Sequence, residues 1–281
     1  MNRMYEDYYR MDKMPTIWCP GCGNGIVLNG FIEAFKNSGL DREKTVIVSG
    51  IGCSSRSALY LDFDTIHTTH GRAISFATGI KQARPELNVV VLTGDGDCSA
   101  IGGNHLIHAA RRNIDITVVC YNNSTYGMTN GQYSPTTPTG SLTATSMYGF
   151  MESPFDLCKL VEAAGATYVA RTTTFHAKMI PLLIKNALQK KGFSFIDCIA
   201  QCPTYFGRKN KMPAGADMLK WIRDSSVNKK QAETMTEDEL AGKFVIGEFV
   251  NKEKPELTAE YTKLIERLKV KAGENFCKSM S

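Results

Sequence analysis

The chain has 281 residues, 43% hydrophobic and 22% charged, which excludes a disordered chain, a collagen-like fibre and a disulfide-stapled miniprotein. Lys and Arg outnumber Asp and Glu by 33 to 28, a formal net charge of +5, and no basic block interleaved with aromatics indicates nucleic-acid binding. No signal-peptide stretch or membrane-crossing apolar run is apparent. We therefore expect a cytoplasmic protein that binds neither nucleic acid nor membrane. In that reducing compartment its nine cysteines are expected to be metal ligands, redox groups or buried thiols.

Short apolar runs rich in β-branched residues predict buried parallel strands at 45–53, 88–97, 116–123 and 194–202. Amphipathic stretches predict helices near 25–38, 70–84, 103–113 and 155–164, the last with Ser153 as N-cap and Pro154 at its first position. This alternation predicts a doubly wound α/β fold, in which a mostly parallel sheet carries helices on both faces. Ligands of such sheets bind beyond the carboxyl ends of the strands.

Residues 124–150 are dense in Thr, Ser, Gly and Pro, and a loop of this length inside a domain is usually functional or disordered. After residue 204 the pattern weakens, and a further helix is predicted near 256–272. We divide the chain into a domain over residues 1–225 and a C-terminal extension over residues 226–281 that faces a partner.

Polar residues follow two of the predicted strands. Gly94-Asp95-Gly96-Asp97 closes one strand with a Gly-rich turn that can approach phosphate closely, and Asn122-Asn123 closes the next. Asp95 and Asn123 are 28 positions apart, enough for one strand–helix–strand crossover, and their oxygens suit Mg²⁺. Taken singly, both motifs are ordinary turn sequences. Taken together, they resemble the thiamine diphosphate (ThDP) binding motif.

The cysteines form a second pattern. Cys19 and Cys22 make a C-x-x-C knuckle, which alone fits zinc, a redox pair or an iron–sulfur cluster. No second such pair follows, but Cys53 and Cys202 stand at strand ends, and one pair with two dispersed thiolates can form the Cys₄ site of a [4Fe–4S] cluster. Apolar surroundings predict buried structural thiols for Cys120, Cys158 and Cys198; Cys98 lies beside the diphosphate turn and Cys277 in the tail.

These motifs together resemble the β subunit of the 2-oxoacid:ferredoxin oxidoreductases over about residues 15–225. The segments that carry the resemblance are WCPGCGNG, SGIGCSSR, HTTHGRAISFATGIKQARPEL, GDGDCSAIGGNHLIHAARRN and YNNSTYGMTNGQYSPTTP, followed by QCP. The YGMT segment and the Arg after CSS look most like the 2-oxoglutarate branch. One departure is Asn130, where relatives usually carry Gly.

The resemblance implies a role for each matching position. Cys19, Cys22, Cys53 and Cys202 would bind one [4Fe–4S] cluster, and Asp95, Asn123 and the main-chain oxygen of Thr125 would hold Mg²⁺. The residues expected around ThDP are Ile51, Gly52, Cys53, Ser54, Gly96, Asp97, Gly127 and Met128. His70 would face the diphosphate or the reacting centre, with a satisfied structural histidine as the alternative for His70 and for His67. His105 and His108 are expected to serve packing.

The implied activity is CoA-dependent oxidative decarboxylation of 2-oxoglutarate to succinyl-CoA and CO₂, with electrons passed through the cluster to ferredoxin. An α subunit, or α and γ subunits, would supply the glutamate that activates ThDP, in an (αβ)₂ assembly. Alternatives are a pyruvate or broad-range 2-oxoacid oxidoreductase, a non-redox ThDP decarboxylase or synthase subunit, and a non-enzymatic iron–sulfur or zinc scaffold.

Arg56 bears on the choice of substrate. It follows the cofactor loop closely, and a guanidinium offers two donors to the distal carboxylate that 2-oxoglutarate has and pyruvate lacks. The alternative is a surface Arg, or one paired with Asp62 or Asp64.

Overall fold

A computed structural model describes residues 3–279, with side chains described over 6–271. The strands are β1 (Thr45–Ser49), β2 (Asp64–His67), β3 (Asn88–Gly94), β4 (Thr117–Asn122), β5 (Thr125–Tyr126), β6 (Gln132–Tyr133), β7 (Tyr168–Thr173), β8 (Ser194–Ile199), β9 (Ser226–Asn228) and β10 (Phe244–Asn251). The α-helices are α1 (Asn24–Lys36), α2 (Ser57–Tyr60), α3 (Ala73–Ala83), α4 (Gly103–Arg112), α5 (Leu157–Ala163), α6 (Met179–Gln189), α7 (Gly215–Asp224), α8 (Lys229–Ala232), α9 (Glu237–Leu240) and α10 (Leu257–Ser279).

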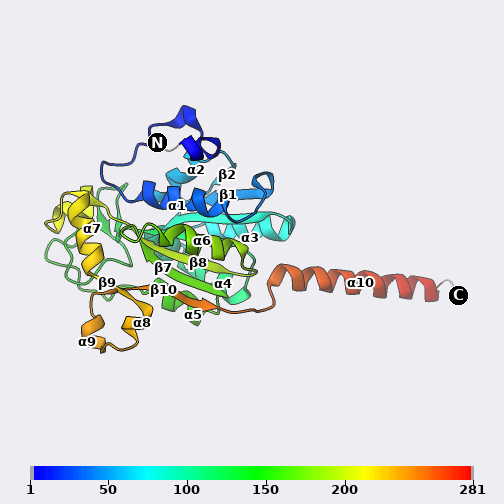
Figure 1. The fold of residues 1–281 in the computed structure, drawn as a ribbon. Coiled ribbons are helices and arrows are strands. Elements are labelled where there is room, and N and C mark those ends of the chain that lie inside the picture. Colours follow the sequence, from blue (N-terminus) through cyan, green and yellow to red (C-terminus); the bar gives the residue numbers. More distant parts are fainter. Residues whose placement is uncertain (1–2, 280–281) are drawn as a thin grey trace.

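Eight of these strands form one sheet in the order β2-β1-β3-β4-β8-β7-β10-β9 (Figure 1). Neighbours from β2 to β7 are parallel, whereas β10 runs antiparallel to β7. The four predicted strands are β1, β3, β4 and β8, and they stand side by side at the centre of the sheet. Every residue of β1, β4 and β8 is buried, as expected for strands covered on both faces.

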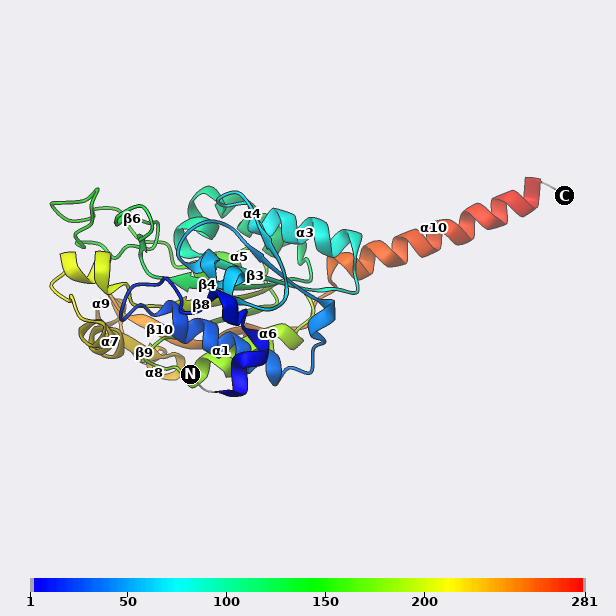
Figure 2. The ribbon, with the colours of Figure 1, turned by 90° about the horizontal axis from the view of Figure 1, so that it is seen from above.

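Two layers of helices cover the sheet (Figure 2). Helices α1 and α6 pack together on one face, where Phe31 and Ile184 belong to one apolar core. Helices α3, α4 and α5 lie on the other face, where Leu106 and Val161 belong to a second core. This arrangement confirms the predicted doubly wound α/β fold.

The start of α5 differs from the prediction. Its N-cap is Asp156, whose carboxylate accepts hydrogen bonds from the backbone N–H groups of Cys158 at 3.1 Å and Lys159 at 3.2 Å. Ser153 and Pro154 lie before the helix and are exposed. The prediction of Ser153 as the cap was wrong, because an N-cap must reach the free amides two and three residues ahead of it.

The predicted extension over residues 226–281 adds strands to the same sheet before its last helix, α10, leaves the sheet. The boundary at residue 225 falls after α7, and β9 and β10 then add two strands to the edge beside β7. Helix α10 projects away from the rest of the chain (Figure 1). Among residues 3–279, no helix combines the length and apolar character needed to span a membrane.

Candidate functional site

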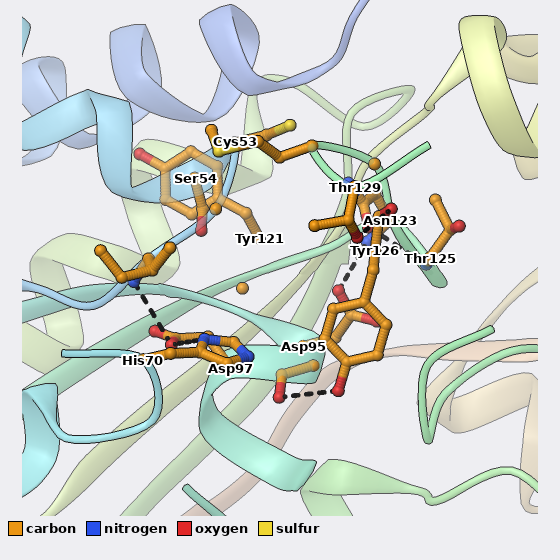
Figure 3. Close-up of a pocket in the computed structure, with 16 residues that line it drawn as sticks. Cys53, Ser54, His70, Asp95, Asp97, Tyr121, Asn123, Thr125, Tyr126 and Thr129 are labelled. Carbon is orange, nitrogen blue, oxygen red and sulfur yellow. Dashed lines mark hydrogen bonds and ion pairs between the residues drawn. The ribbon is translucent and has the colours of Figure 1, made fainter. Parts of the chain in front are cut away.

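The loops that follow β1, β2, β3 and β4 enclose a cavity of about 660 Å³ at the carboxyl edge of the sheet (Figure 3). Residues from loops far apart in sequence meet there because parallel strands end at one edge. The walls contain all residues predicted to surround ThDP or Mg²⁺, namely Ile51, Gly52, Cys53, Ser54, His70, Asp95, Gly96, Asp97, Asn123, Thr125, Gly127 and Met128. Gly94, part of the predicted Gly-rich turn, also lines the cavity, and the sequence did not predict the other wall residues, which are Tyr121, Tyr126 and Thr129.

Asp97 organises one side of this cavity. One carboxylate oxygen accepts a hydrogen bond from the Gly71 N–H at 2.7 Å and lies 2.6 Å from Nδ1 of His70, and the other accepts from the Thr93 hydroxyl at 2.7 Å. The side chain is only 3% exposed. Because both oxygens already have partners, Asp97 acts from the cavity wall by orienting His70, and a carboxylate partner favours a proton on Nδ1. The nearby His67 instead contacts the Ser49 hydroxyl and the Gly50 carbonyl.

Asp95 lies on the opposite side, fully buried, and burial raises the pKa of its carboxyl group. Its Oδ2 accepts hydrogen bonds from the hydroxyls of Ser134 at 2.5 Å and Thr136 at 2.6 Å. From the described residues, its Oδ1 accepts only a long bond, 3.4 Å, from the Asn123 N–H, drawn dashed in Figure 3. Asn123 Oδ1 in turn accepts from the Thr125 N–H at 3.2 Å. The three predicted Mg²⁺ ligands are therefore adjacent, and this set of hard oxygen donors fits a magnesium–diphosphate group.

Two glycines of the motifs are required by close packing. A Cβ at Gly50 would overlap the Asp97 carboxylate, and a Cβ at Gly96 would overlap the ring of Tyr126. The Tyr126 hydroxyl donates to the Gly96 carbonyl at 3.3 Å, and burial raises the pKa of this tyrosine to about 12. Tyr126 therefore holds the diphosphate turn as a neutral phenol.

A second cavity, of about 760 Å³, adjoins the first, and its walls contain all four predicted cluster ligands, Cys19, Cys22, Cys53 and Cys202. The indole N–H of Trp18 donates to the Cys53 carbonyl at 2.7 Å, and the Gly23 N–H donates to the Gln201 carbonyl at 3.0 Å. These two bonds join the C-x-x-C knuckle to both strand-end loops. The cavities share Cys53, Asn123, Gly127 and Met128.

The thiols of the second cavity differ from a reactive redox pair. Burial, with a smaller contribution from the neighbouring cysteines, raises the pKa of Cys22 to about 12 and of Cys53 to about 11, and burial also raises the pKa of Cys202. Bound iron would displace these protons, as metals do when they bind thiolates. Over the described side chains, no three His, Cys, Asp or Glu groups lie close enough to hold one metal ion. Four thiols around one larger cavity fit a polynuclear cluster better than a single zinc ion.

The other described cysteines lie elsewhere. Cys120, Cys158 and Cys198 are buried, as predicted for structural thiols. Cys98, for which no such prediction was made, is also buried, and its sulfur lies 3.8 Å from that of Cys120. The side chain of Cys277 lies outside the described residues.

Arg56 lines the cysteine cavity rather than the first cavity. Asp62 is paired with Arg42 at 3.3 Å, and in the described part of the chain Arg56 has no carboxylate partner. The positive charge of Arg56 lowers the pKa of the Cys53 thiol, but burial has the larger effect and raises it.

Asn130, the departure from the family pattern, has a φ of 81°, and its side chain accepts a hydrogen bond from the Tyr205 hydroxyl at 3.0 Å. Asn is among the residues that best tolerate this left-handed conformation.

Comparison with known proteins is consistent with this geometry. Residues 50–198 match the family described as "Thiamine pyrophosphate enzyme, C-terminal TPP binding domain". The 2-oxoglutarate synthase subunit KorB of Methanocaldococcus jannaschii is 56% identical over 262 residues, which cover 93% of this chain and 97% of that protein. The KorB subunit of Archaeoglobus fulgidus is 52% identical over 277 residues, 98% of each chain. The chain belongs to the KorB family.

A solved structure supports this placement of the fold. The 2-oxoglutarate:ferredoxin oxidoreductase from Magnetococcus marinus, with 2-oxoglutarate, coenzyme A and succinyl-CoA bound, matches this KorB-family chain with a TM-score of 0.83 and 38% identity. The match covers 95% of this chain and 92% of that one. The family resemblance predicted from the motifs is therefore confirmed.

Proposed function

We propose that this chain is the β subunit of a 2-oxoglutarate:ferredoxin oxidoreductase, which converts 2-oxoglutarate and CoA to succinyl-CoA and CO₂ with two electrons passed to ferredoxin. The KorB relatives and the solved structure with bound 2-oxoglutarate and CoA support the reaction. The observation that carries the proposal is the pair of adjoining cavities that share Cys53, Asn123, Gly127 and Met128. A diphosphate site and a thiol site with a common wall suit decarboxylation coupled to electron transfer.

In the first cavity, Asp95, Asn123 and the Thr125 carbonyl would hold Mg²⁺, and the other predicted wall residues would surround ThDP. ThDP supplies an electron sink for the carbanion that remains when CO₂ leaves a 2-oxoacid. Ile51 and Met128 present apolar side chains that are 46% and 42% exposed in this chain, and a bound cofactor would cover them. His70, oriented by Asp97, would hold a proton near the diphosphate or the reacting centre.

In the second cavity, Cys19, Cys22, Cys53 and Cys202 would bind one [4Fe–4S] cluster, which transfers electrons one at a time. The common wall keeps this group next to the ThDP cavity. Trp18 and Tyr205 add aromatic side chains to the walls of this second cavity. A reducing cytoplasm, which we propose as the location, would keep the four thiols available for iron.

The chain requires a companion subunit for catalysis. The acidic residues in the wall of the first cavity are Asp95 and Asp97, and both are buried and hydrogen-bonded. Neither is free to activate the aminopyrimidine of ThDP. We therefore expect an α subunit, or α and γ subunits, to supply a glutamate to this cavity.

The extension over residues 226–281 is proposed to face a partner through α10. Tyr261, Leu264, Ile265 and Leu268 are exposed at helical spacing. At the start of α10, the Leu257 N–H donates a hydrogen bond to the Asn113 carbonyl. Asn113 precedes β4, so α10 begins at the amino edge of the sheet, opposite the edge that carries the cofactor cavity. We propose a second copy of this chain as the occupant. Residues 256–263 contain Glu256, Glu260 and Lys263, and residues 264–271 contain Glu266, Arg267, Lys269 and Lys271. Two antiparallel copies would therefore place a net negative half against a net positive half.

The test is to purify the chain with its companion subunit and to measure thiamine, iron, sulfide and the visible spectrum. Ferredoxin reduction is then followed with 2-oxoglutarate and CoA, and with pyruvate and CoA as the comparison. We expect thiamine, iron and sulfide to be present, with the visible absorbance of the cluster, and ferredoxin reduction to prefer 2-oxoglutarate. Equal rates with pyruvate would favour a broad-range oxidoreductase. Thiamine without iron would indicate a non-redox ThDP enzyme, and iron without thiamine a scaffold protein.

A further inference from the structure

The loop rich in Ser, Thr and Pro between β6 and α5 buries hydroxyl groups that the sequence motifs leave unexplained. Ser134 and Thr137 are fully buried and Thr136 is 7% exposed. Burying a hydroxyl costs free energy unless it forms hydrogen bonds. The Thr137 hydroxyl donates to the Ser124 carbonyl at 2.7 Å and accepts from the Ser134 N–H at 2.8 Å. The loop is therefore fastened back onto the turn that follows β4.

This fastening places two hydroxyls on one oxygen of Asp95. Ser134 and Thr136 both donate to Oδ2, at 2.5 and 2.6 Å, whereas in the described part of the chain Oδ1 receives only the 3.4 Å bond from the Asn123 N–H. A carboxylate oxygen that accepts two short bonds has little capacity left for a cation, and the other oxygen keeps its capacity. The two hydroxyls also fix the rotation of the carboxylate about its χ2 bond.

Besides Asp95, Thr136 contacts the first of a series of buried side chains that are hydrogen-bonded to one another. Its hydroxyl oxygen lies 2.9 Å from Asn122 Oδ1, and the Asn122 amide donates to Asp197 Oδ1 at 3.1 Å. Asp197 Oδ2 accepts from the Arg171 Nε–H at 2.8 Å. The single Thr136 hydroxyl hydrogen is shared between two acceptors, Asp95 Oδ2 at 2.6 Å and Asn122 Oδ1 at 2.9 Å, and the charged carboxylate is the stronger of the two. The chain of contacts thus runs from a buried arginine to the proposed metal ligand.

We propose that Ser134 and Thr136 are positioning residues of the metal–diphosphate site, which occupy Oδ2 of Asp95 and leave Oδ1 to bind Mg²⁺. Asn122, Asp197 and Arg171 hold Thr136 in place. The inference rests on the proposed ThDP–Mg²⁺ site and adds to it a role for the loop. Partners in the second coordination shell commonly change metal affinity 10- to 100-fold when removed.

The experiment uses the complex with the companion subunit, stripped of metal and supplied with ThDP. Binding of Mn²⁺, as a paramagnetic substitute for Mg²⁺, is titrated by electron paramagnetic resonance. Thr136→Val removes the hydroxyl at nearly constant shape, and we expect about 10- to 100-fold weaker Mn²⁺ binding. Thr136→Ser restores the donor and should return affinity to near wild type. Saturating metal should return most of the kcat of Thr136→Val, because the residue positions a ligand and does not react.

Thr139→Val is the matched control, since Thr139 lies on the same loop but is exposed and donates to the Glu152 carbonyl at 3.0 Å. Its Mn²⁺ affinity should equal that of the wild type. Ser134→Ala tests the second donor if Thr136→Val folds poorly, and should also weaken binding. Wild-type affinity in both Thr136→Val and Ser134→Ala, or an equal loss in Thr139→Val, would overturn the inference. A wild-type complex without a ThDP-dependent Mn²⁺ site would instead overturn the proposed function, and this inference with it.

Discussion

Cys53 lies in the wall of both cavities, and the two proposed groups meet at this residue. We predict that replacing Cys53 or Cys202 by Ala removes the visible absorbance of the cluster and abolishes ferredoxin reduction, because a [4Fe–4S] cluster needs all four thiolates. Iron and sulfide analysis and the spectrum measure this. Cys158→Ala is the control, since Cys158 is buried in the apolar core, and its iron content should stay near wild type. A full complement of iron and sulfide in Cys202→Ala would contradict the four-ligand assignment.

Arg56 carries the prediction on substrate choice. A charge-assisted contact with the distal carboxylate of 2-oxoglutarate contributes about 1.5–3 kcal/mol, which corresponds to about 10- to 150-fold in kcat/KM. We therefore expect Arg56→Ala to lose about that factor on 2-oxoglutarate and little on pyruvate. Steady-state kinetics with both acids decides the question. Equal losses on both would assign Arg56, which lines the cysteine cavity, to the cluster rather than to the substrate.

The residues predicted from the sequence are those whose motifs lie next to strand ends, such as Asp95 and Cys53. They could be placed because a parallel sheet brings its strand ends to one edge. Ser134 and Thr136 could not, because they reach Asp95 across 39 and 41 residues of sequence. Composition indicated a functional or disordered loop there, but nothing local showed which hydroxyl would meet which carboxylate.

At the scale of elements, Asp156 joins the start of α5 to the sheet. It caps the helix and also contacts Arg171 at 2.5 Å. Asp156→Ala should lower the free energy of unfolding by about 0.5–3 kcal/mol, since caps contribute about 0.5–2 kcal/mol and the ion pair, whose carboxylate is 37% exposed, adds at most about 1 kcal/mol. Asp156→Asn keeps the capping oxygen and should lose less. Urea unfolding at neutral pH measures both.

The same residue predicts a pH dependence. Burial alone would raise the pKa of Asp156, but Arg171 outweighs it, and the pKa lies below the ordinary value of 3.8. A carboxyl group with a lowered pKa in the folded state stabilises the fold above its unfolded pKa, and this contribution is lost as the pH falls through its folded pKa. The stability difference between wild type and Asp156→Asn should therefore narrow below about pH 4. A constant difference would contradict the prediction.

Strands with a continuous apolar run were predictable, and β8 was among them although it contains the buried Asp197, whereas β7 was not predicted. β7 is fully buried but contains Arg171, which is tolerated there because Asp197 pairs with it from β8. Only the fold supplies that partner. β10 contains Gly247 and Glu248 and pairs with β7 through a register shift, so its sequence lacks both the alternation and the apolar run that indicate a strand.

At the scale of the whole molecule, the exposed apolar face of α10 predicts that two copies of the chain associate. Leu264→Glu with Leu268→Glu places charges on the exposed apolar face of α10, so two copies should no longer pair. Light scattering coupled to size-exclusion chromatography should show the mass of the complex halved. Glu266→Gln on the same helix is the control and should leave the mass unchanged. Turnover per site should persist in the double variant, because α10 begins at the edge opposite the cavities. An unchanged mass would reject this contact.

The hydrogen bond from Trp18 to Cys53 also gives the protein an optical reporter. The chain has two tryptophans; Trp18 lines the cysteine cavity, and the Trp221 ring lies 5.8 Å from that of Phe206, four residues after Cys202. A cluster absorbs at the wavelengths at which indoles emit, so energy transfer should quench the intrinsic fluorescence. Emission should therefore fall as iron and sulfide are incorporated and recover when a chelator removes them. Trp18→Phe should lose most of this fluorescence change, because Trp18 lies in the wall of the cysteine cavity. The fluorescence of the wild type would then follow cluster assembly in real time without added dye.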